Sequence, residues 1–569
     1  MEILNKTYDL IPKEFRVKIV LIFLSSILVA LLEILSIALI LPLISALVNP
    51  EGLNFLNKYF DIQNLIFLLN KSEVITYGIL VFVLIILIKV IALIFLNIYK
   101  ANFYYKIRIK MTNILFKKYL NEDYLFHVYN NSSVLITNIH GEIGLFVKKI
   151  LNVFSEIFLD LILFFSLLII LLNIRFYETL ITLFIFIIFI LFYYYLIKKR
   201  LDYWGKERQK KDRLKLKHVQ QSLLGIKEVK LYLRELFFEK VLSDIIKKRE
   251  DVTRKLSYIG PLPRYLLEIG TVIFILIFTI FFSKSDENLT LLLPEFALYF
   301  ASFLRMLPIC VKLINNLQAI KFGSPVVKTL HREFGRQQKK TTVEKKVNFN
   351  ENIKFKNVSF KYPNKSNYIL ENVNLTLPQG KIIGIIGTTG SGKTTFLNLL
   401  TSLISPTSGE IVCDSINITE ENRNWKRKIS YVTQKTFLTD DTIKNNIIFG
   451  DTSEFNDFRF KESLKLSNLE QFIIDLPNGF DTVVGEGGTQ LSGGQIQRIS
   501  IARALYNSPE ILVFDEATNS VDEVTEKNII KEIFKLRGKC TIFIVTHNKG
   551  LTINCDENYF VGNKNIKKI

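Results

Sequence analysis

The sequence contains few cysteines, and none of them is arranged for a metal site or a disulfide framework. Among 569 residues there are 4 cysteines and 5 histidines. The cysteines are Cys310, Cys413, Cys540 and Cys555. They show no C-x-x-C spacing and no pairing with histidine, so neither zinc binding nor structural disulfides are expected. We interpret these thiols as ordinary packing residues.

The sequence is also poor in acidic residues relative to basic ones. It has 73 Lys and Arg against 53 Asp and Glu, which gives a formal net charge of +20. In a soluble protein this excess would suit nucleic-acid binding. Here it accompanies apolar runs that are too long for a soluble surface, in a chain that is 49% hydrophobic. We therefore expect no nucleic acid as a partner and favour an anionic membrane surface or an anionic substrate.

Six apolar runs are long enough to cross a bilayer, which takes about 20 residues per helix. They occupy residues 17–48, 74–98, 150–172, 177–198, 259–283 and 290–320. The connections after the second and fourth runs are rich in Lys and Arg, whereas the stretch KSDEN after the fifth is short and acidic. The positive-inside rule then places both termini in the cytoplasm. The helical pattern of the basic connections predicts that these spans continue as long cytoplasmic rods.

The second half of the chain has a different pattern. Residues 324–350 are polar and charged and read as a linker. After them, strand-like runs alternate with helical ones, as in an α/β domain. The sequence thus predicts a helical membrane domain at 1–323, a linker at 324–350 and an α/β domain at 351–569.

The first functional motif of the α/β domain is a phosphate-binding loop. The stretch GTTGSGKTT follows the apolar strand IIGII and precedes a helical pattern. It places Gly387, Gly392, Lys393 and Thr394 at the fixed positions of G-x-x-x-x-G-K-[ST]. In such a loop, glycines turn backbone N–H groups toward phosphate oxygens, the lysine reaches the β and γ phosphates, and the hydroxyl binds Mg²⁺. Three further members of this loop are Gly390, Ser391 and Thr395.

Two more motifs follow the loop in order. The apolar run ILVFDEAT ends in Asp515, which can hold Mg²⁺, and Glu516, which can orient or deprotonate an attacking water. These acids could instead cap the next helix, but their position after a phosphate loop favours catalysis. The second motif, LSGGQ, lies between the phosphate loop and ILVFDEAT. Its last four residues stand at the expected start of a helix, where free backbone N–H groups can bind an anion. Those residues are Ser492, Gly493, Gly494 and Gln495.

With this ordered set, residues 351 to roughly 550 resemble the ATP-binding cassette (ABC) family. The resemblance implies ATP and Mg²⁺ as cofactors. It further implies that Tyr362 stacks on adenine, that Gln434 links the γ-phosphate and metal site to the membrane domain, and that Asp522 makes an inter-subunit contact. His547, which alone would read as a plain strand-end histidine, corresponds to the γ-phosphate switch. Glu516, Gln434 and His547 are therefore the expected catalytic residues, and Thr394, Gln434 and Asp515 the expected metal ligands.

The resemblance also has consequences for the assembly. In this family the LSGGQ loop of one chain closes on the ATP of the other, so one membrane domain with one cassette implies a homodimer. Six spans fused to a cassette resemble the type IV ABC exporters, located here in a bacterial inner membrane with the cassette in the cytoplasm. Segments 124–133 and 222–232 would then be the coupling helices.

Several charges fall inside the expected spans, where they are costly unless they face a partner or a cavity. Glu33 and Lys89 sit near mid-span and could neutralise one another. Arg264 and Glu268 are spaced i, i+4 and could do the same. Arg305 has no such neighbour in its own helix, which favours another partner such as a phosphate. A cavity lined by Lys89, Arg264 and Arg305 would suit a pyrophosphate.

A closer resemblance supports this reading. The stretches PRYLLE, RMLP and ALLEILSIALILPLI, together with an expected outer-loop helix within 49–73, are similar to the bacterial flippases of lipid-linked oligosaccharides. This resemblance implies an undecaprenyl-pyrophosphate glycan moved from the cytoplasmic to the periplasmic leaflet. Lys89 departs from it, since an arginine is expected there.

Two alternatives remain open on the sequence. One keeps the fold and changes the cargo to another lipid, a drug or a peptide. The other changes the class, with ATP gating a channel or regulating a partner. Glu516 argues against the second alternative, because a device that only senses ATP does not need the hydrolytic carboxylate.

Overall fold

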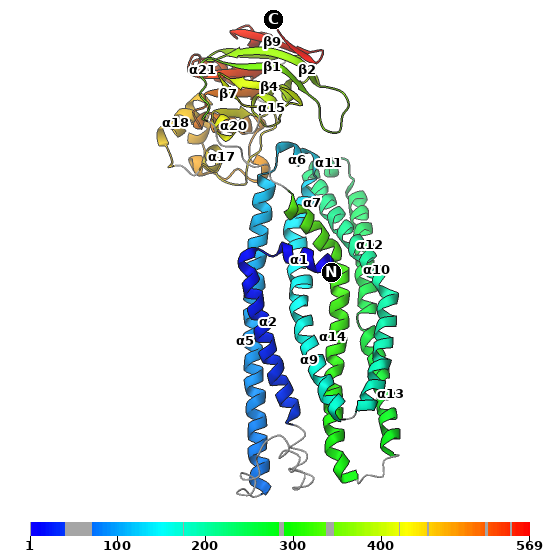
Figure 1. Cartoon of the computed structure of the whole chain (residues 1–569). Coiled ribbons are helices and arrows are strands. Elements are labelled where there is room, and N and C mark those ends of the chain that lie inside the picture. The colour runs from blue at the N-terminus through cyan, green and yellow to red at the C-terminus, as the bar shows by residue number, and fades with distance from the viewer. Residues whose placement is uncertain are drawn as a thin grey trace. The chain divides into compact units, whose positions relative to one another are not determined.

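The structure is a computed structural model that describes residues 2–39, 71–174, 176–283, 289–336, 346–419, 422–451, 454–517, 522–546 and 549–569 (Figure 1). It divides into two compact units. The helical unit comprises Met1–Glu122 and His127–Gln338, and the α/β unit comprises Asp123–Phe126 and Lys339–Ile569. The outer-loop helix expected within 49–73 falls mostly outside the described residues.

Six long helices form the helical unit within the described ranges. They are α2 (Lys13–Ala38), α5 (Lys71–Leu120), α9 (Asn152–Ile174), α10 (Phe176–Leu224), α13 (Leu262–Ser283) and α14 (Leu289–Gly335). Each covers one of the six predicted apolar runs, and the expected helical membrane domain is confirmed. Helices α5 and α10 are 50 and 49 residues long, so both spans continue as the predicted rods.

Further helices connect these six. Helix α1 (Glu2–Leu10) precedes α2, and α12 (Glu235–Ile259) leads into α13. Between α5 and α9 lie α6 (Tyr124–Tyr129), α7 (Ser132–Thr137), α8 (Ile143–Phe146) and two π-helical turns, η2 (Asn138–Glu142) and η3 (Val147–Leu151). Helix α11 (Ile226–Leu231) joins α10 to α12. Short helices thus stand at both predicted coupling segments, while their docking stays a prediction.

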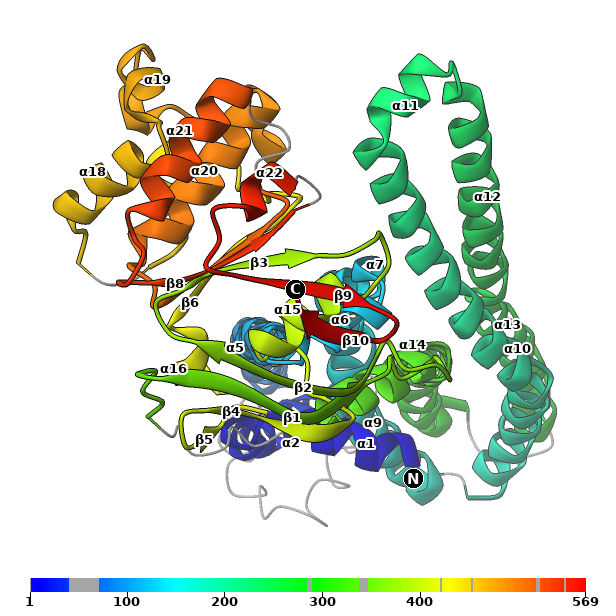
Figure 2. The same cartoon turned by 90° about the horizontal axis from the view of Figure 1, so that it is seen from above.

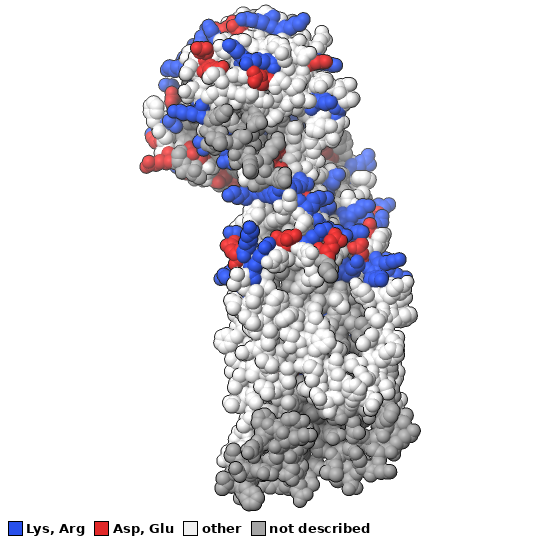
Figure 3. Space-filling model, viewed as in Figure 1, with Lys and Arg blue, Asp and Glu red and all other residues white. Residues whose placement is uncertain are grey.

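The surface of the long helices is suited to lipid. Within the described residues, three helical stretches are long and apolar enough to cross a membrane: Lys13–Ala38, Thr76–Leu120 and Ser132–Asn173. Large apolar side chains such as Phe95 and Ile169 are 69% and 59% exposed on them. In Figure 3, the middle of the helical unit carries almost no charge on the face shown, and Lys, Arg, Asp and Glu gather toward one end. This distribution matches a membrane-embedded bundle whose helices extend beyond the membrane at one end.

Close helix contacts and a buried cluster hold the helical unit together. A side-chain carbon at Gly205 in α10 would lie 2.2 Å from the carbonyl oxygen of Phe322 in α14. Helix α14 continues to Gly335, into the range 324–350 that the sequence indicated as a linker. The difference arises because Val326, Val327 and Leu330 are buried, while Lys328 between them is exposed.

The α/β unit contains two sheets. The first has the order β2-β1-β4-β5 and is antiparallel, with β1 (Asn352–Phe360), β2 (Leu370–Pro378), β4 (Ser408–Cys413) and β5 (Ile416–Asn417). The second has the order β10-β9-β3-β8-β7-β6. Its strands are β3 (Ile382–Ile386), β6 (Ile429–Val432), β7 (Ile511–Asp515), β8 (Thr541–Val545), β9 (Glu557–Gly562) and β10 (Asn565–Lys568). All neighbours in it are parallel except β9 and β10.

Helices complete the α/β unit. They are α15 (Lys393–Leu400), α16 (Arg423–Lys426), α17 (Ile443–Ile448), α18 (Asp457–Leu466), α19 (Glu470–Ile474), α20 (Gly493–Tyr506), α21 (Glu523–Phe534) and α22 (Lys549–Thr552). The 3₁₀ turns η4 (Gly479–Asp481) and η5 (Glu486–Gly488) lie between α19 and α20. The alternation of strands and helices confirms the predicted α/β class.

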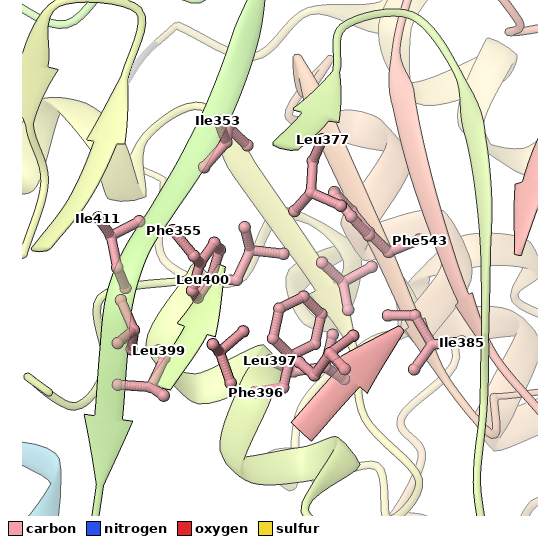
Figure 4. Packing of buried hydrophobic residues seen from close by; sticks show 14 of the residues in the cluster. Ile353, Phe355, Leu377, Ile385, Phe396, Leu397, Leu399, Leu400, Ile411 and Phe543 are labelled. Carbon is pink, nitrogen blue, oxygen red and sulfur yellow. The ribbon is translucent and has the colours of Figure 1, made fainter. Parts of the chain in front are cut away.

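Helix α15 is the centre of the main core of this unit. It lies between the two sheets, as Figures 2 and 4 show. Phe396 and Leu399 are buried at 1% and 0% exposure, and the ring of Phe396 packs 5.3 Å from that of Phe355 in β1. On the other side, Ile385 of β3 and Phe543 of β8 close the cluster (Figure 4). The helix that begins at the phosphate loop is therefore fixed from both sheets.

Candidate functional site

The candidate site gathers at one edge of the six-stranded sheet. Strands β3, β8, β7 and β6 are parallel neighbours, so their carboxyl ends meet at this edge. The phosphate loop follows β3, Asp515 ends β7, and Gln434 comes two residues after β6. Ligands of open α/β sheets bind at the carboxyl ends of the strands. The topology thus brings together three motifs that are far apart in the sequence.

The phosphate loop has the backbone that its glycines permit. Gly390 and Gly392 adopt φ values of +80° and +108°, which favour residues without a side chain. Lys393 is 8% exposed, and its ammonium donates to the carbonyl oxygens of Gly387 and Thr388 at 2.7 and 3.1 Å. The lysine is therefore folded back over its own loop and would have to turn to reach a phosphate.

The residues present fit a nucleotide with Mg²⁺. The hydroxyl of Ser391 is buried in the loop without a hydrogen-bond partner, which is a costly arrangement unless a ligand supplies one. Thr394 is exposed at the start of α15, where backbone N–H groups are free to bind an anion. No group of three or more His, Cys, Asp or Glu side chains forms a metal cage in the described part of the chain. Mg²⁺ characteristically takes one or two protein ligands together with phosphate oxygens.

Tyr362 and Thr395 flank the loop. The Tyr362 hydroxyl lies 3.3 Å from the Thr395 hydroxyl, and its ring meets that of Phe360 edge to face at 5.0 Å. The tyrosine is thus held beside the phosphate loop with part of its ring accessible. This is the position in which an aromatic residue could stack on a base.

Asp515 has a partner that the sequence did not indicate. The hydroxyl of Tyr431 donates to Asp515 Oδ2 at 2.7 Å. Burial raises the pKa of Asp515, and the Tyr431 bond and the charge of Lys393 oppose that rise. Burial, together with the nearby Asp515 carboxylate, also raises the pKa of Tyr431. Tyr431 pairs with Val513 in the β6–β7 register, so its side chain shares a face with Asp515. The Tyr431–Asp515 contact could be recognised only once the order of the strands was known.

Glu516 and Gln434 are joined directly. Gln434 Nε2 donates to Glu516 Oε2 at 2.7 Å. Glu516 adopts φ +51°, an uncommon value for a residue with a side chain, and its backbone N–H donates to the carbonyl oxygen of Val545 at 3.0 Å. The strained backbone turns the carboxylate out of the sheet and toward the segment after β6. The structure thus confirms that these two residues share one site, while their roles stay predictions.

The LSGGQ turn starts α20 with a capping box. Ser492 Oγ accepts from the backbone N–H of Gln495 at 3.2 Å, and Gln495 Oε1 accepts from that of Ser492 at 2.8 Å. Gly493 and Gly494 form the first turn, whose N–H groups face outward. Asp522 similarly caps α21 by accepting from the N–H of Thr525 at 2.9 Å, a bond that holds its pKa below the usual range.

His547, the expected γ-phosphate switch, lies outside the described residues. The strand before it, β8, ends at Val545 at the same sheet edge as the phosphate loop.

In the helical unit, each predicted substrate cation has an acidic partner. Lys89 Nζ lies 3.4 Å from Glu33, and Arg305 also pairs with Glu33. Arg264 binds Glu268 at 2.8 Å, with its side chain 70% exposed. The sequence favoured a phosphate as the partner of Arg305, but the structure shows Glu33 of α2 there, which spacing within one helix could not reveal. The pairs Glu33–Lys89 and Arg264–Glu268, which the sequence allowed, are present.

Comparison with known proteins agrees with this site. A family model described as ABC transporter matches residues 370–519, and one described as ABC transporter transmembrane region matches residues 19–262. The ATP-dependent lipid A-core flippase of Haemophilus influenzae (strain 86-028NP) is 30% identical over 339 residues, which cover 59% of this chain and 57% of that protein. The protein of the same name from Desulfotalea psychrophila (strain LSv54 / DSM 12343) is 42% identical over 200 residues, 35% of this chain and 34% of the relative. The matches thus span little more than half of these relatives at most.

The fold comparison covers nearly the whole chain. A solved structure of a bacterial Atm1-family ABC exporter with ATP bound superposes with a TM-score of 0.80 at 20% identity, over 97% of this chain and 94% of that one. This likeness shows the type IV exporter fold. With a transmembrane model matching its first half and an ABC model matching its second, the chain is an ABC transporter whose transmembrane region and ATP-hydrolysing domain are fused in one polypeptide.

Proposed function

We propose that two copies of this chain form an exporter that uses ATP hydrolysis to flip an anionic lipid across the membrane. The observation that carries the ATP part is the convergence of the phosphate loop, Asp515 and the Glu516–Gln434 pair at one sheet edge. A carboxylate 2.7 Å from an amide beside a phosphate loop can orient a water for attack on a γ-phosphate. A site that only sensed ATP would not need it.

The roles follow from the chemistry of each group. Lys393 and the loop N–H groups bind the phosphates, and Thr394 and Asp515 hold Mg²⁺, which neutralises charge on the transferred phosphoryl group when bound. Glu516 accepts a proton from the attacking water or orients it, and Gln434 reports the occupancy of the site through its bond to Glu516. Tyr362 stacks on the base. The ATP of the other copy receives hydroxyl and N–H donors from Ser492, Gly493 and Gly494. Asp522 makes the inter-subunit contact, and His547 contacts the γ-phosphate.

A homodimer accounts for the apolar tip of the α10–α12 hairpin. Leu224, Leu231, Leu233 and Leu236 are 72–84% exposed there, beyond the part of the helices suited to lipid. Such a cluster on a cytoplasmic extension is costly in water and favours a protein partner. We propose the second copy as that partner, with both termini in the cytoplasm of a bacterial inner membrane.

The lipid class rests on two arguments. Two relatives carry the name ATP-dependent lipid A-core flippase, which names a lipid as the cargo of those proteins. In this chain, Glu33 neutralises one of its two basic partners, Lys89 and Arg305, so one positive charge remains at that depth to attract an anion. Within this class we propose an undecaprenyl-pyrophosphate oligosaccharide as the finer candidate, contacted by Lys89, Arg305 and Arg264.

The test is ATP-driven movement of labelled lipids in liposomes that contain the purified chain. Three cargoes are compared: an undecaprenyl-pyrophosphate oligosaccharide, a lipid A-type glycolipid and a neutral glycolipid. We expect movement of at least one anionic cargo and none of the neutral one, and loss of movement in Glu516→Gln. Movement of the neutral lipid alone would contradict an anionic cargo, and movement of lipid A but not the pyrophosphate lipid would reject only the finer candidate. Full biological activity of Glu516→Gln would favour the channel or regulator alternative.

A further inference from the structure

The helical unit contains a cavity of about 810 Å³ that the ATP chemistry does not use. One wall is the face of α5 from Leu93 to Arg108. The other walls are the π-helical turns, α8 and the first turns of α9, with Lys312 of α14 at one side. All of these elements belong to the same unit. The cavity is therefore a feature of one chain and needs no second copy to exist.

Basic side chains dominate its polar lining. Lys100, Arg108, Lys148 and Lys312 line it, and Glu156 is the one acid among the described residues that line it. Lys312 is paired with Asp160, a neighbour just outside the lining, at 3.2 Å. Even when both acids are counted, the lining keeps an excess of positive charge. An anion is thus the ligand that its electrostatics favours.

Lys100 is the side chain that points to a ligand. It is 7% exposed, and its ammonium has no hydrogen bond and no ion pair within the described part of the chain. Glu156 and Asp160 act on it through space, but Glu156 already accepts from Asn152 at 2.8 Å and Asn316 at 3.4 Å. Lys100 is therefore mostly buried and lines the cavity, where a bound anion would supply the partner that the described chain does not.

The apolar part of the lining indicates the kind of anion. Leu93, Leu96 and Leu159 line one part of the cavity, whereas Arg108 and Lys148 are solvent-exposed and line another. A molecule that fills both parts has an acyl chain and a charged head. Phosphate oxygens accept charge-assisted hydrogen bonds from both lysine and arginine.

We propose that this cavity binds an anionic phospholipid by its phosphate head, with Lys100 as the buried contact and Arg108 and Lys148 as exposed ones. The site is distinct from the Glu33, Lys89 and Arg305 cluster, none of whose residues lines this cavity. The proposal rests on the proposed function only in its choice of a lipid as the phosphate carrier.

The experiment measures binding to the full chain in neutral detergent without ATP. The probes are labelled phosphatidic acid, diacylglycerol with the same acyl chains, and inorganic phosphate as competitor. The variants are Lys100→Met, Lys100→Arg and, as a matched control, Lys106→Met, which removes an exposed cation of α5 that does not line the cavity. We expect Lys100→Met to weaken phosphatidic acid binding by about tenfold or more, since a charge-assisted hydrogen bond is lost. Lys100→Arg and Lys106→Met should bind like the parent chain.

A second readout separates binding from folding. Removal of an unpaired buried charge should raise the melting temperature of the lipid-free chain in Lys100→Met. Phosphatidic acid should raise the melting temperature of the parent chain but not of this variant.

The outcomes decide the proposal independently of transport. Equal binding by Lys100→Met and the parent, or an equal loss in Lys106→Met, would overturn it. If diacylglycerol bound as well as phosphatidic acid, the site would be apolar and the proposal wrong. If inorganic phosphate displaced the lipid at equal concentration, the ligand would be a free anion and the lipid assignment would fall. Because no ATP is present, a chain that binds at this cavity but moves no lipid would contradict the proposed function alone.

Discussion

At the residue scale, Tyr431 is the partner of Asp515, the proposed metal ligand. Asp515 is partly buried, which raises its pKa, and the Tyr431 hydroxyl opposes this by donating to the charged form at 2.7 Å. Mg²⁺ needs the ionised carboxylate. With a raised pKa, protonation begins at a higher pH than for an ordinary aspartate, so metal binding is lost from the acidic side as pH falls.

Tyr431→Phe therefore tests this bond. It removes one hydrogen bond to the charged form and should therefore raise the Asp515 pKa further. We expect the acid limb of the ATPase pH profile to move to higher pH, with the activity at alkaline pH little changed. Tyr506→Phe, which removes an α20 hydroxyl that accepts from the backbone N–H of Asn456 at 3.3 Å, is the control. If the acid limb did not move, the Tyr431 hydroxyl would have no effect on the pKa of Asp515, and its proposed role would be wrong.

The residue scale is also where sequence reasoning was least complete. The motif residues could be assigned because each is defined by its neighbours in the chain. Partners that come from other elements could not be assigned in this way. The partner of Arg305, Glu33, lies on another helix, and the partner of Asp515, Tyr431, lies on another strand. Such pairs depend on helix rotation and strand order, which spacing within one segment does not contain.

At the element scale, the contact between α10 and α14 depends on the absence of a side chain at Gly205. A carbon there would lie 2.2 Å from a backbone oxygen, so the helices would have to separate. We expect Gly205→Ala to destabilise the chain by about 1–3 kcal/mol, the usual cost of overpacking.

Gly335→Ala in α14 is the matched control, since nothing lies within 4 Å of its added carbon. Its effect should be neutral or slightly stabilising, because alanine is the better helix former. Thermal unfolding of both variants in the same detergent measures the difference. A melting temperature for Gly205→Ala equal to that of the parent would contradict the close contact.

The start of α20 gives a second prediction for an element. Ser492 closes the capping box with Gln495. Ser492→Ala should cost about 0.5–2 kcal/mol of helix stability, and the proposed role predicts a larger loss of ATP turnover than of stability. Asn456→Ala, which removes the cap of α18 with the bond to Arg459 N–H, is the control and should lower stability alone. Equal effects of the two variants on turnover would leave Ser492 a cap only.

The helices and strands were predicted from the sequence more completely than the contacts of single residues. The six apolar runs, the rods and the α/β alternation are periodic patterns, and they specify helices and strands directly. The end of α14 differed because its last turns bury Val326, Val327 and Leu330, while Lys328 and Arg332 are exposed. A helix that mixes buried apolar and exposed charged residues looks like a linker when only composition is considered.

At the scale of the whole molecule, the apolar tip of the α10–α12 hairpin is the surface that we expect to contact the second copy in the proposed homodimer. The leucines of this tip are 72–84% exposed in the single chain, and Leu233→Lys would place a charge among them. We expect this substitution to abolish the dimer that ATP traps in the Glu516→Gln background, while the melting temperature of the chain stays unchanged. Light scattering of both proteins with ATP measures it. A dimer of undiminished population would show that another surface joins the copies.

The central claim is that hydrolysis at the Glu516–Gln434 site drives lipid movement by this chain. It is tested most directly by measuring phosphate release and the movement of a labelled anionic lipid in the same liposomes, for the parent and for Glu516→Gln. We predict that the variant loses both together, with turnover at least about 10²-fold lower, as for the loss of a general base. Lipid movement at the parent rate in a variant that no longer hydrolyses ATP would contradict the account.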